Sequence, residues 1–140
     1  MIKIKNKLGK TRVYSRKFIQ KIIPEEKFIK SKLKLKKKRP VAFGGLRFKN
    51  LFKNSIKKKP LISIVMPNFK GLSIEKAIKS ILKQNYENLE LIVIDGNSGE
   101  DTLKILKSYN KDIDIWISEK DKGMWDAWNN GNKLANGDNV

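Results

Sequence analysis

Two apolar segments separated by one amphipathic segment constrain the fold of this chain more than any other feature of its sequence. Residues Leu61–Met66 and Leu89–Ile94 are nearly continuous apolar runs that stop at polar residues, as expected of strands buried on both faces of a sheet. Between them, apolar residues recur with a helical period from Ile74 to Leu82, and Ser73 stands where it can cap that helix. The unit has the length of a β-α-β crossover, so we expect two parallel strands joined by a right-handed connection.

The same alternation continues toward the C-terminus. Apolar residues recur at helical spacing over Asp101–Tyr109, and they alternate with more polar ones over Ile113–Ser118, which predicts a third strand with one more polar face. A last helical pattern begins at Met124, with Gly137 as its predicted C-cap. The order β-α-β-α-β-α predicts an α/β fold with an open, mostly parallel sheet and flanking helices.

The last helical pattern carries several large apolar side chains. Met124, Ala127 and Leu134 lie on one predicted face, and we expect this stripe to be core. Trp125 and Trp128 lie on or near the same face, so packing in the core is favoured over stacking on a substrate.

Charge divides the chain into two parts. Residues 1–60 contain 22 Lys and Arg but only two Glu, whereas residues 61–140 contain 10 Lys and 12 Asp and Glu. The net charge is therefore +20 in the first part and −2 in the second, which together give the formal +18 of the chain. We predict a basic N-terminal arm and lead-in over residues 1–60, and one α/β unit over residues 61–140.

Some chemistries are excluded by composition. The chain has neither cysteine nor histidine, so disulfides, thiolate or histidine catalysis and Cys/His zinc sites are all ruled out. No segment approaches the roughly 20 apolar residues that cross a bilayer, and lysines interrupt the N-terminus where a signal peptide would be apolar. These features fit a cytoplasmic protein.

The segment Val41–Pro60 leads from the basic arm to the first strand of the α/β unit. Its apolar residues, from Phe43 to Ile56, are interspersed with lysines. It is either a short amphipathic helix on a membrane surface or a segment that packs on the domain, and packing is favoured.

Polar clusters follow all three predicted strands, at the edge where open α/β sheets bind their ligands. The clusters are Pro67–Lys70, Asp95–Ser98 and Glu119–Gly123. Asp95 can accept hydrogen bonds from ribose hydroxyls or a uracil-like base. Lys122 can meet a diphosphate, and Gly123 lets the backbone approach it closely.

Each candidate has a structural alternative. An aspartate after a strand, such as Asp95, is often a turn or helix-capping residue. Asp121-Lys122-Gly123 taken alone is an ordinary solvated turn. Neither alternative can be discarded on the residues alone.

Five segments together resemble the N-terminal part of a family 2 glycosyltransferase of the GT-A type. They are Ser63–Lys70 (SIVMPNFK), Gln84–Tyr86 (QNY), Asp95–Thr102 (DGNSGEDT), Asp121–Gly131 (DKGMWDAWNNG) and Ala135–Asp138 (ANGD). Their joint order and spacing are similar to those of capsule and lipopolysaccharide transferases. The resemblance implies a Rossmann-like fold and an enzyme of polysaccharide biosynthesis, which transfers a sugar from a nucleotide-diphosphate donor to a surface-polysaccharide or glycolipid acceptor.

The resemblance also implies roles for individual residues in binding the nucleotide-sugar. Pro67, Asn68, Phe69 and Asp95 correspond to contacts of the nucleoside. Asp121, Lys122 and Gly123 correspond to the neighbourhood of the diphosphate. The chain departs from the family at Phe69, where a Tyr is usual, and at Lys70, where an Asn is usual.

The family's divalent metal, Mg²⁺ or Mn²⁺, neutralises the diphosphate leaving group and is held by a DxD-type motif. In this chain the motif, the catalytic base and the acceptor site are all expected beyond Val140, so we assign neither catalytic residues nor metal ligands. The expectation is a truncated transferase that binds nucleotide weakly and is inactive alone.

Two alternative functions are a nucleic-acid-binding module and a dinucleotide-dependent dehydrogenase. The basic arm makes non-specific phosphate binding unavoidable at low salt, but it lacks the motifs of a dedicated nucleic-acid module, so no specific nucleic acid is expected. An anionic membrane surface is the other possible partner of residues 1–60, which would make the protein peripheral on the inner face of the cytoplasmic membrane. A dinucleotide-dependent dehydrogenase is disfavoured, because only Gly71 follows the first strand where G-x-G-x-x-G is required.

Overall fold

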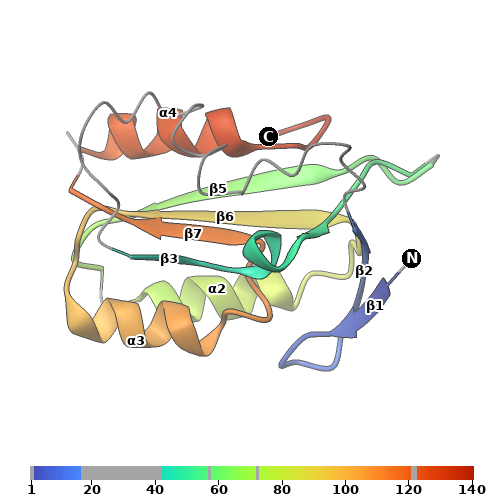
Figure 1. Ribbon diagram of the computed structural model, residues 1–140, viewed down its shortest axis with the longest axis horizontal. Coiled ribbons are helices and arrows are strands. Elements are labelled where there is room, and N and C mark those ends of the chain that lie inside the picture. The colour runs from blue at the N-terminus through green and yellow to red at the C-terminus, as the bar shows by residue number, and fades with distance from the viewer. Residues whose placement is uncertain (1, 17–41, 57, 72, 121–122) are drawn as a thin grey trace.

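A computed structural model describes residues 2–16, 42–56, 58–71, 73–120 and 123–140 (Figure 1). Its central feature is a four-stranded sheet in the order β3-β7-β6-β5. The strands are β3 (Ala42–Gly44), β5 (Ile62–Asn68), β6 (Leu89–Asp95) and β7 (Ile115–Ser118). Strands β5, β6 and β7 are parallel, and β3 joins the edge of β7 antiparallel. The predicted α/β fold with a mostly parallel sheet is confirmed.

Helices cover both faces of this sheet (Figure 1). Helices α2 (Ile74–Leu82) and α3 (Glu100–Ser108) lie on one face, and α4 (Met124–Leu134) lies on the other. Each face has its own apolar core, and alternate residues of β6 point into each: Leu91 and Val93 toward α2 and α3, Ile92 and Ile94 toward α4. Every residue of β6 is buried, as expected for a central parallel strand.

The third strand differs from its prediction in one respect. The alternation in the sequence predicts a more polar face, but Trp116 is 1% exposed and Ser118 is fully buried. Strand β3 pairs along β7 and closes the edge that would otherwise face solvent. Trp116 packs in the core with residues of α2 and α3, and Ser118 donates to the buried Asp95, so the side chains of this face of β7 are internal.

Two predicted helix caps also differ. Ser73 is the N-cap residue of α2, but its side chain makes no capping hydrogen bond. The C-cap of α4 is Ala135 in an extended conformation, two residues before the predicted Gly137.

The first 16 residues contain strands that the sequence analysis did not predict. Strands β1 (Ile2–Lys5) and β2 (Thr11–Arg16) form an antiparallel hairpin, and β2 also pairs with β4 (Leu51–Phe52). The amide Nδ2 of Asn6 donates to the carbonyl of Leu82 at 3.2 Å, which ties the hairpin to the end of α2. These described residues therefore pack on the α/β unit. The division of the chain at residue 60 stays a prediction, and the basic run over residues 34–39 lies outside the described residues.

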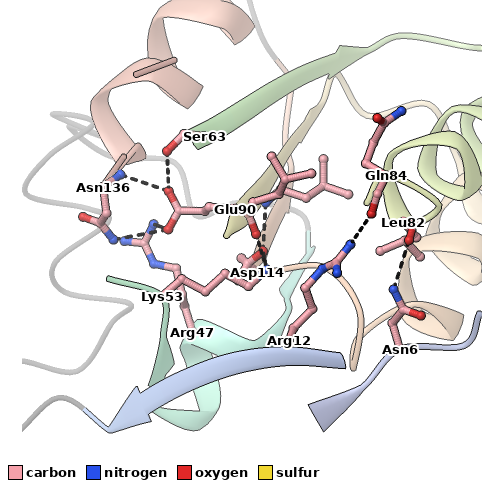
Figure 2. A network of polar contacts seen from close by, with 12 residues as sticks. Asn6, Arg12, Arg47, Lys53, Ser63, Leu82, Gln84, Glu90, Asp114 and Asn136 are labelled. Carbon is pink, nitrogen blue, oxygen red and sulfur yellow. Dashed lines mark hydrogen bonds and ion pairs between the residues drawn. The ribbon is translucent and has the colours of Figure 1, made fainter. Parts of the chain in front are cut away.

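Residues 42–56 are built into the fold through charged side chains (Figure 2). Besides β3 and β4, this segment contains the short 3-10 helix η1 (Leu46–Lys49). Arg47 is 1% exposed and donates through Nη1 to the carbonyl of Leu134 at 2.7 Å. Lys53 is 4% exposed, and its Nζ lies 3.0 Å from Oδ2 of the buried Asp114. The interpretation of this segment as a lead-in that packs on the domain is confirmed. None of the helices in the described part of the chain is long and apolar enough to cross a bilayer.

Candidate functional site

Three polar residues form a row across the carboxyl edge of the sheet. In the strand register Asn68 of β5 is the partner of Asp95 of β6, and Asp95 is the partner of Ser118 of β7. Each is the last residue of its strand. The parallel arrangement of the three strands therefore brings these side chains together, at the edge where the sequence predicts a ligand site.

Asp95 is the centre of this row, and its side chain is saturated by protein donors. Its Oδ1 accepts from Asn68 Nδ2 at 2.8 Å and from Ser98 Oγ at 2.5 Å. Its Oδ2 accepts from the backbone N–H of Ser98 at 3.0 Å and from Ser118 Oγ at 2.8 Å. Asp95 is fully buried, and burial of a carboxylate is tolerated because these four hydrogen bonds replace those of water.

These contacts give Asp95 a clear structural role. The bond from the Ser98 N–H closes the turn that follows β6, as the turn alternative predicted. It is not a helix cap, because the N-cap of α3 is Gly99. The predicted contact of Asp95 with a nucleoside stays a prediction.

A small cavity lies beside this row. It has a volume of about 160 Å³ and is lined by Pro67, Asn68, Phe69, Met124 and Ala127. Three of the predicted nucleoside-binding positions therefore share one hollow with the first turn of α4. The volume is below the roughly 300–1,000 Å³ of complete small-molecule sites, so the cavity has room for one ring of a ligand.

Gly123 begins α4 at the same edge. It is the N-cap residue with a φ of 111°, and a Cβ added there would meet nothing within 4 Å. The backbone conformation, rather than lack of space, therefore favours glycine at this position. Asp121 and Lys122, the other two predicted diphosphate neighbours, lie outside the described residues.

The aromatic residues of α4 are not in the core, which corrects the sequence prediction. Trp125 is 71% exposed and Trp128 is 44% exposed, and their rings stack with centroids 5.7 Å apart. Met124 is 64% exposed, so only Ala127 and Leu134 of the predicted stripe are buried. The helix turns its small residues toward the sheet: a Cβ on Gly131 would lie 2.3 Å from Val65 Cγ1. This close approach leaves the tryptophans on the outer side.

Ser98 was predicted only as part of the Asp95–Ser98 cluster, and Ser118 was not predicted as a site residue. Ser98 lies within the motif after the second strand, and its hydroxyl also accepts from the Lys70 N–H at 2.7 Å. Ser118 is the last residue of the third strand, next to the polar cluster that begins at Glu119. Treating the last residue of every parallel strand as one row would have found Ser118.

The described part of this edge does not have the composition of a metal site. Both oxygens of Asp95 already accept two hydrogen bonds each, and no second carboxylate shares them. Across the described ranges, no group of three or more His, Cys, Asp or Glu side chains is placed to hold a metal ion. The described residues of this edge do not fit the family's divalent cation.

Comparison with known proteins identifies the family. The sequence model described as Glycosyl transferase family 2 matches residues 63–140, which is more than half of the chain. The chain belongs to glycosyltransferase family 2. The strand-end row, the cavity and the start of α4 all fall within the matched residues.

Several curated glycosyltransferases are similar to this chain. An uncharacterized glycosyltransferase of Mycobacterium tuberculosis (strain CDC 1551 / Oshkosh) is 37% identical over 81 residues, covering 56% of this chain and 31% of the relative. The UDP-Glc:alpha-D-GlcNAc-diphosphoundecaprenol beta-1,3-glucosyltransferase of Escherichia coli is 38% identical over 79 residues, covering 55% of this chain and 31% of the relative. The GalNAc(5)-diNAcBac-PP-undecaprenol beta-1,3-glucosyltransferase of Campylobacter jejuni is 43% identical over 56 residues, covering 39% and 18%.

The similarity involves one part of each relative. The chain matches about a third or less of the length of these curated proteins. No solved structure gives a significant match to the chain. The sequence thus establishes the family of the chain, and the structure gives the geometry of its strand edge.

Proposed function

We propose that the carboxyl edge of the sheet binds the nucleotide part of a nucleotide-diphosphate sugar. The sugar is transferred to a polyprenyl-linked acceptor of surface-polysaccharide or glycolipid synthesis. Support comes from membership of the family and from the names of two relatives, whose acceptors are sugars on diphosphoundecaprenol. Enzymes of this family generally use a divalent metal.

The observation that carries the proposal is the row of Asn68, Asp95 and Ser118 beside the cavity. The cavity takes the nucleobase, with the ring of Phe69 at its wall and 65% exposed. Stacking of a nucleobase on this ring needs no hydroxyl, so Phe69 retains the stacking role of the Tyr that is usual at this position. The ribose then lies toward the row.

Asp95 reaches the nucleoside by exchange of hydrogen-bond partners. All four contacts of its carboxylate come from the protein, so a ligand group has to replace one donor. The Ser98 hydroxyl is the one that exchanges most readily, because Ser98 is only half-buried and its neighbour Asn97 is exposed with a φ of 61°. A ribose hydroxyl or base N–H takes the place of the Ser98 hydroxyl, while Asn68 and Ser118 hold the carboxylate in position.

The diphosphate lies toward the start of α4. The first N–H groups of a helix favour negative charge, and Gly123 leaves that end without a side chain. Lys122 supplies the positive charge in this proposal.

The test is calorimetric titration of UDP, and of other nucleoside diphosphates, into the chain and into Asp95→Asn. The substitution replaces one acceptor oxygen with a donor, and a charge-assisted hydrogen bond contributes roughly 1.5–3 kcal/mol. The affinity for the nucleotide should therefore fall by about one to two decades. Asp101→Asn, an exposed carboxylate at the start of α3, is the control with the same change in charge, and it should bind as the parent does. Equal affinity of all three proteins would refute a role for Asp95 in binding.

The location of the protein is a second part of the proposal. A polyprenyl-linked acceptor lies in the membrane, and 22 basic residues among the first 60 favour an anionic surface. We place the enzyme at the inner face of the cytoplasmic membrane as a peripheral protein. Sedimentation with vesicles should increase with anionic lipid content and decrease with salt, and binding insensitive to both would contradict it.

A further inference from the structure

A second, larger cavity lies at the opposite end of the sheet from Asp95. Its volume is about 550 Å³, within the usual range of small-molecule sites. Helix α3 runs back from the carboxyl edge, so its last residue, Ser108, reaches the amino end of the sheet, where the cavity begins. Strand β6 from Leu89 to Asp95 spans about 20 Å at ~3.3 Å per residue, which separates the two ends.

Lysines from three separate segments line this cavity. Lys5 and Lys7 come from β1 and the turn after it, Lys49 from the end of η1, and Lys107 and Lys111 from the end of α3 and the loop that follows. Segments so far apart in the sequence meet here because the β1–β2 hairpin packs beside the C-terminal end of α3 (Figure 1).

One acidic residue lines the cavity, and its side chain is already engaged. Asp112 is 5% exposed, and its Oδ1 accepts from the backbone N–H of Lys7 at 2.9 Å. It thereby fixes the turn of the hairpin to the wall of the cavity. Lys7 is also engaged, because its Nζ lies 4.2 Å from the centre of the Tyr109 ring.

In the described ranges, none of Lys5, Lys49, Lys107 and Lys111 forms an ion pair with a carboxylate. Like charges on the lining of one hollow repel one another, and an anion bound there lowers that repulsion. Asn110 adds a neutral amide to the wall of the cavity. Its Oδ1 accepts from Trp116 Nε1 at 2.6 Å, so its Nδ2 points away from that indole.

We propose that this cavity is a binding site for a phosphate-bearing anion, held chiefly by Lys49, Lys107 and Lys111. The chemistry is that of a diphosphate or a similarly charged group, because lysines of three segments line a space larger than one phosphate requires. The site is independent of the donor site at Asp95, since it lies at the other end of the sheet. The phosphate comes either from a lipid headgroup or from a soluble molecule, and the experiment separates these sources.

The test uses the full 140-residue chain and inorganic pyrophosphate in low-salt buffer, followed by calorimetry. One variant removes the three principal lysines: Lys49→Gln, Lys107→Gln and Lys111→Gln. A control with the same net charge removes three exposed lysines of α2, α3 and α4 that do not line the cavity: Lys76→Gln, Lys104→Gln and Lys133→Gln. The cavity variant should bind pyrophosphate about tenfold more weakly or worse, and the control within about threefold of the parent.

A second readout is local to the cavity. The indole N–H of Trp116 donates to Asn110 at the wall, so its NMR signal should shift on addition of pyrophosphate, whereas those of Trp125 and Trp128 should not. Thermal melts of the variants establish that they are folded. Absence of pyrophosphate binding by the parent, equal loss in both variants, or a Trp116 signal that does not respond would each overturn the proposal.

Vesicles identify the source of the phosphate. Phosphatidylcholine vesicles with and without phosphatidylglycerol are added to the parent and to both variants. Binding that needs the anionic lipid, is lost in the cavity variant and is displaced by pyrophosphate supports a lipid headgroup. Equal vesicle binding by both variants, with pyrophosphate binding still dependent on the cavity, supports a soluble ligand. Cavity-dependent binding of a single-stranded oligonucleotide without binding of pyrophosphate would contradict the site as proposed.

Discussion

Replacement of Lys53 by methionine tests whether residues 42–56 are an integral part of the fold. Lys53 Nζ lies 3.0 Å from Oδ2 of Asp114 and also donates to the carbonyl of Leu89, and both charged side chains are almost completely buried. At an effective dielectric constant of about 20, a pair at this distance attracts by roughly 5 kcal/mol, most of which is offset by desolvation. Methionine retains the apolar stem of lysine but leaves the Asp114 carboxylate buried without its counterion. Breaking one side of such a pair costs about 3–5 kcal/mol, which is a large share of the 5–15 kcal/mol of a whole domain.

A double-mutant cycle measures the pairing itself. Asp114→Asn alone leaves Lys53 buried without a carboxylate, while the amide oxygen still accepts from the Leu91 N–H. The double variant removes both charges, so its free energy of unfolding should lie within about 2 kcal/mol of that of the parent. Urea unfolding followed by circular dichroism gives the four free energies. Losses that add to within about 0.5 kcal/mol would refute the coupling, and unchanged stability of Lys53→Met would show that the segment does not contribute to the folded core.

Three further predictions concern packing and titration. Gly131→Ala should lower the free energy of unfolding by about 1–3 kcal/mol, because the added Cβ would lie 2.3 Å from Val65 Cγ1. This loss outweighs the preference of alanine for helix, which is about 1 kcal/mol. The control Asn132→Ala, on the exposed side of α4, should be neutral or stabilising in the same urea titration. Burial raises the pKa of Asp112 above its ordinary 3.8, so the stability that this carboxyl contributes is present below pH 3.8 and is lost as the pH rises through the folded pKa. Asparagine does not titrate, so in phosphate-free buffer the stability of Asp112→Asn relative to the parent should increase as the pH rises above 3.8. A difference in stability that stays constant with pH would contradict this. Trp125→Ala should change the free energy of unfolding by less than about 0.5 kcal/mol, whereas a loss above 2 kcal/mol would restore the core interpretation of this residue.

The strands and helices of the α/β unit were predictable because their local patterns agree with their burial. Leu89–Ile94 is apolar at nearly every position, and both of its faces are covered in the structure. The same reasoning placed Asp95 and Asn68 at one edge, since parallel strands end together.

The N-terminal strands were not predictable from local pattern. The four residues of β1 alternate isoleucine with lysine, but this stretch is short, and β2 (TRVYSR) has no such alternation. Their position depends on long-range contacts, such as Asn6 with Leu82 and Arg12 with the carbonyl of Gln84 at 3.1 Å (Figure 2). Such contacts join residues more than 70 positions apart, and no window of the sequence contains both partners.

The exposure of the α4 tryptophans was missed for a related reason. A helical period identifies an apolar face only if large residues are the ones that pack. Here Gly131 and Ala127 contact the sheet, and the close approach of helix and strand excludes larger side chains. The identity of the smallest residues, rather than the largest, determines which side of α4 is buried.

The proposed function depends on nucleotide binding at the carboxyl edge of the sheet. Titration of UDP into the isotopically labelled chain, followed by the backbone amide signals, tests it residue by residue. The shifts should concentrate at Asn68 and Phe69, in the turn 95–98, at Ser118 and in the first turn of α4, and they should persist when Lys49, Lys107 and Lys111 are replaced by glutamine. No shifts at these positions, or shifts confined to the lysine-lined cavity near Asn110, would contradict the account.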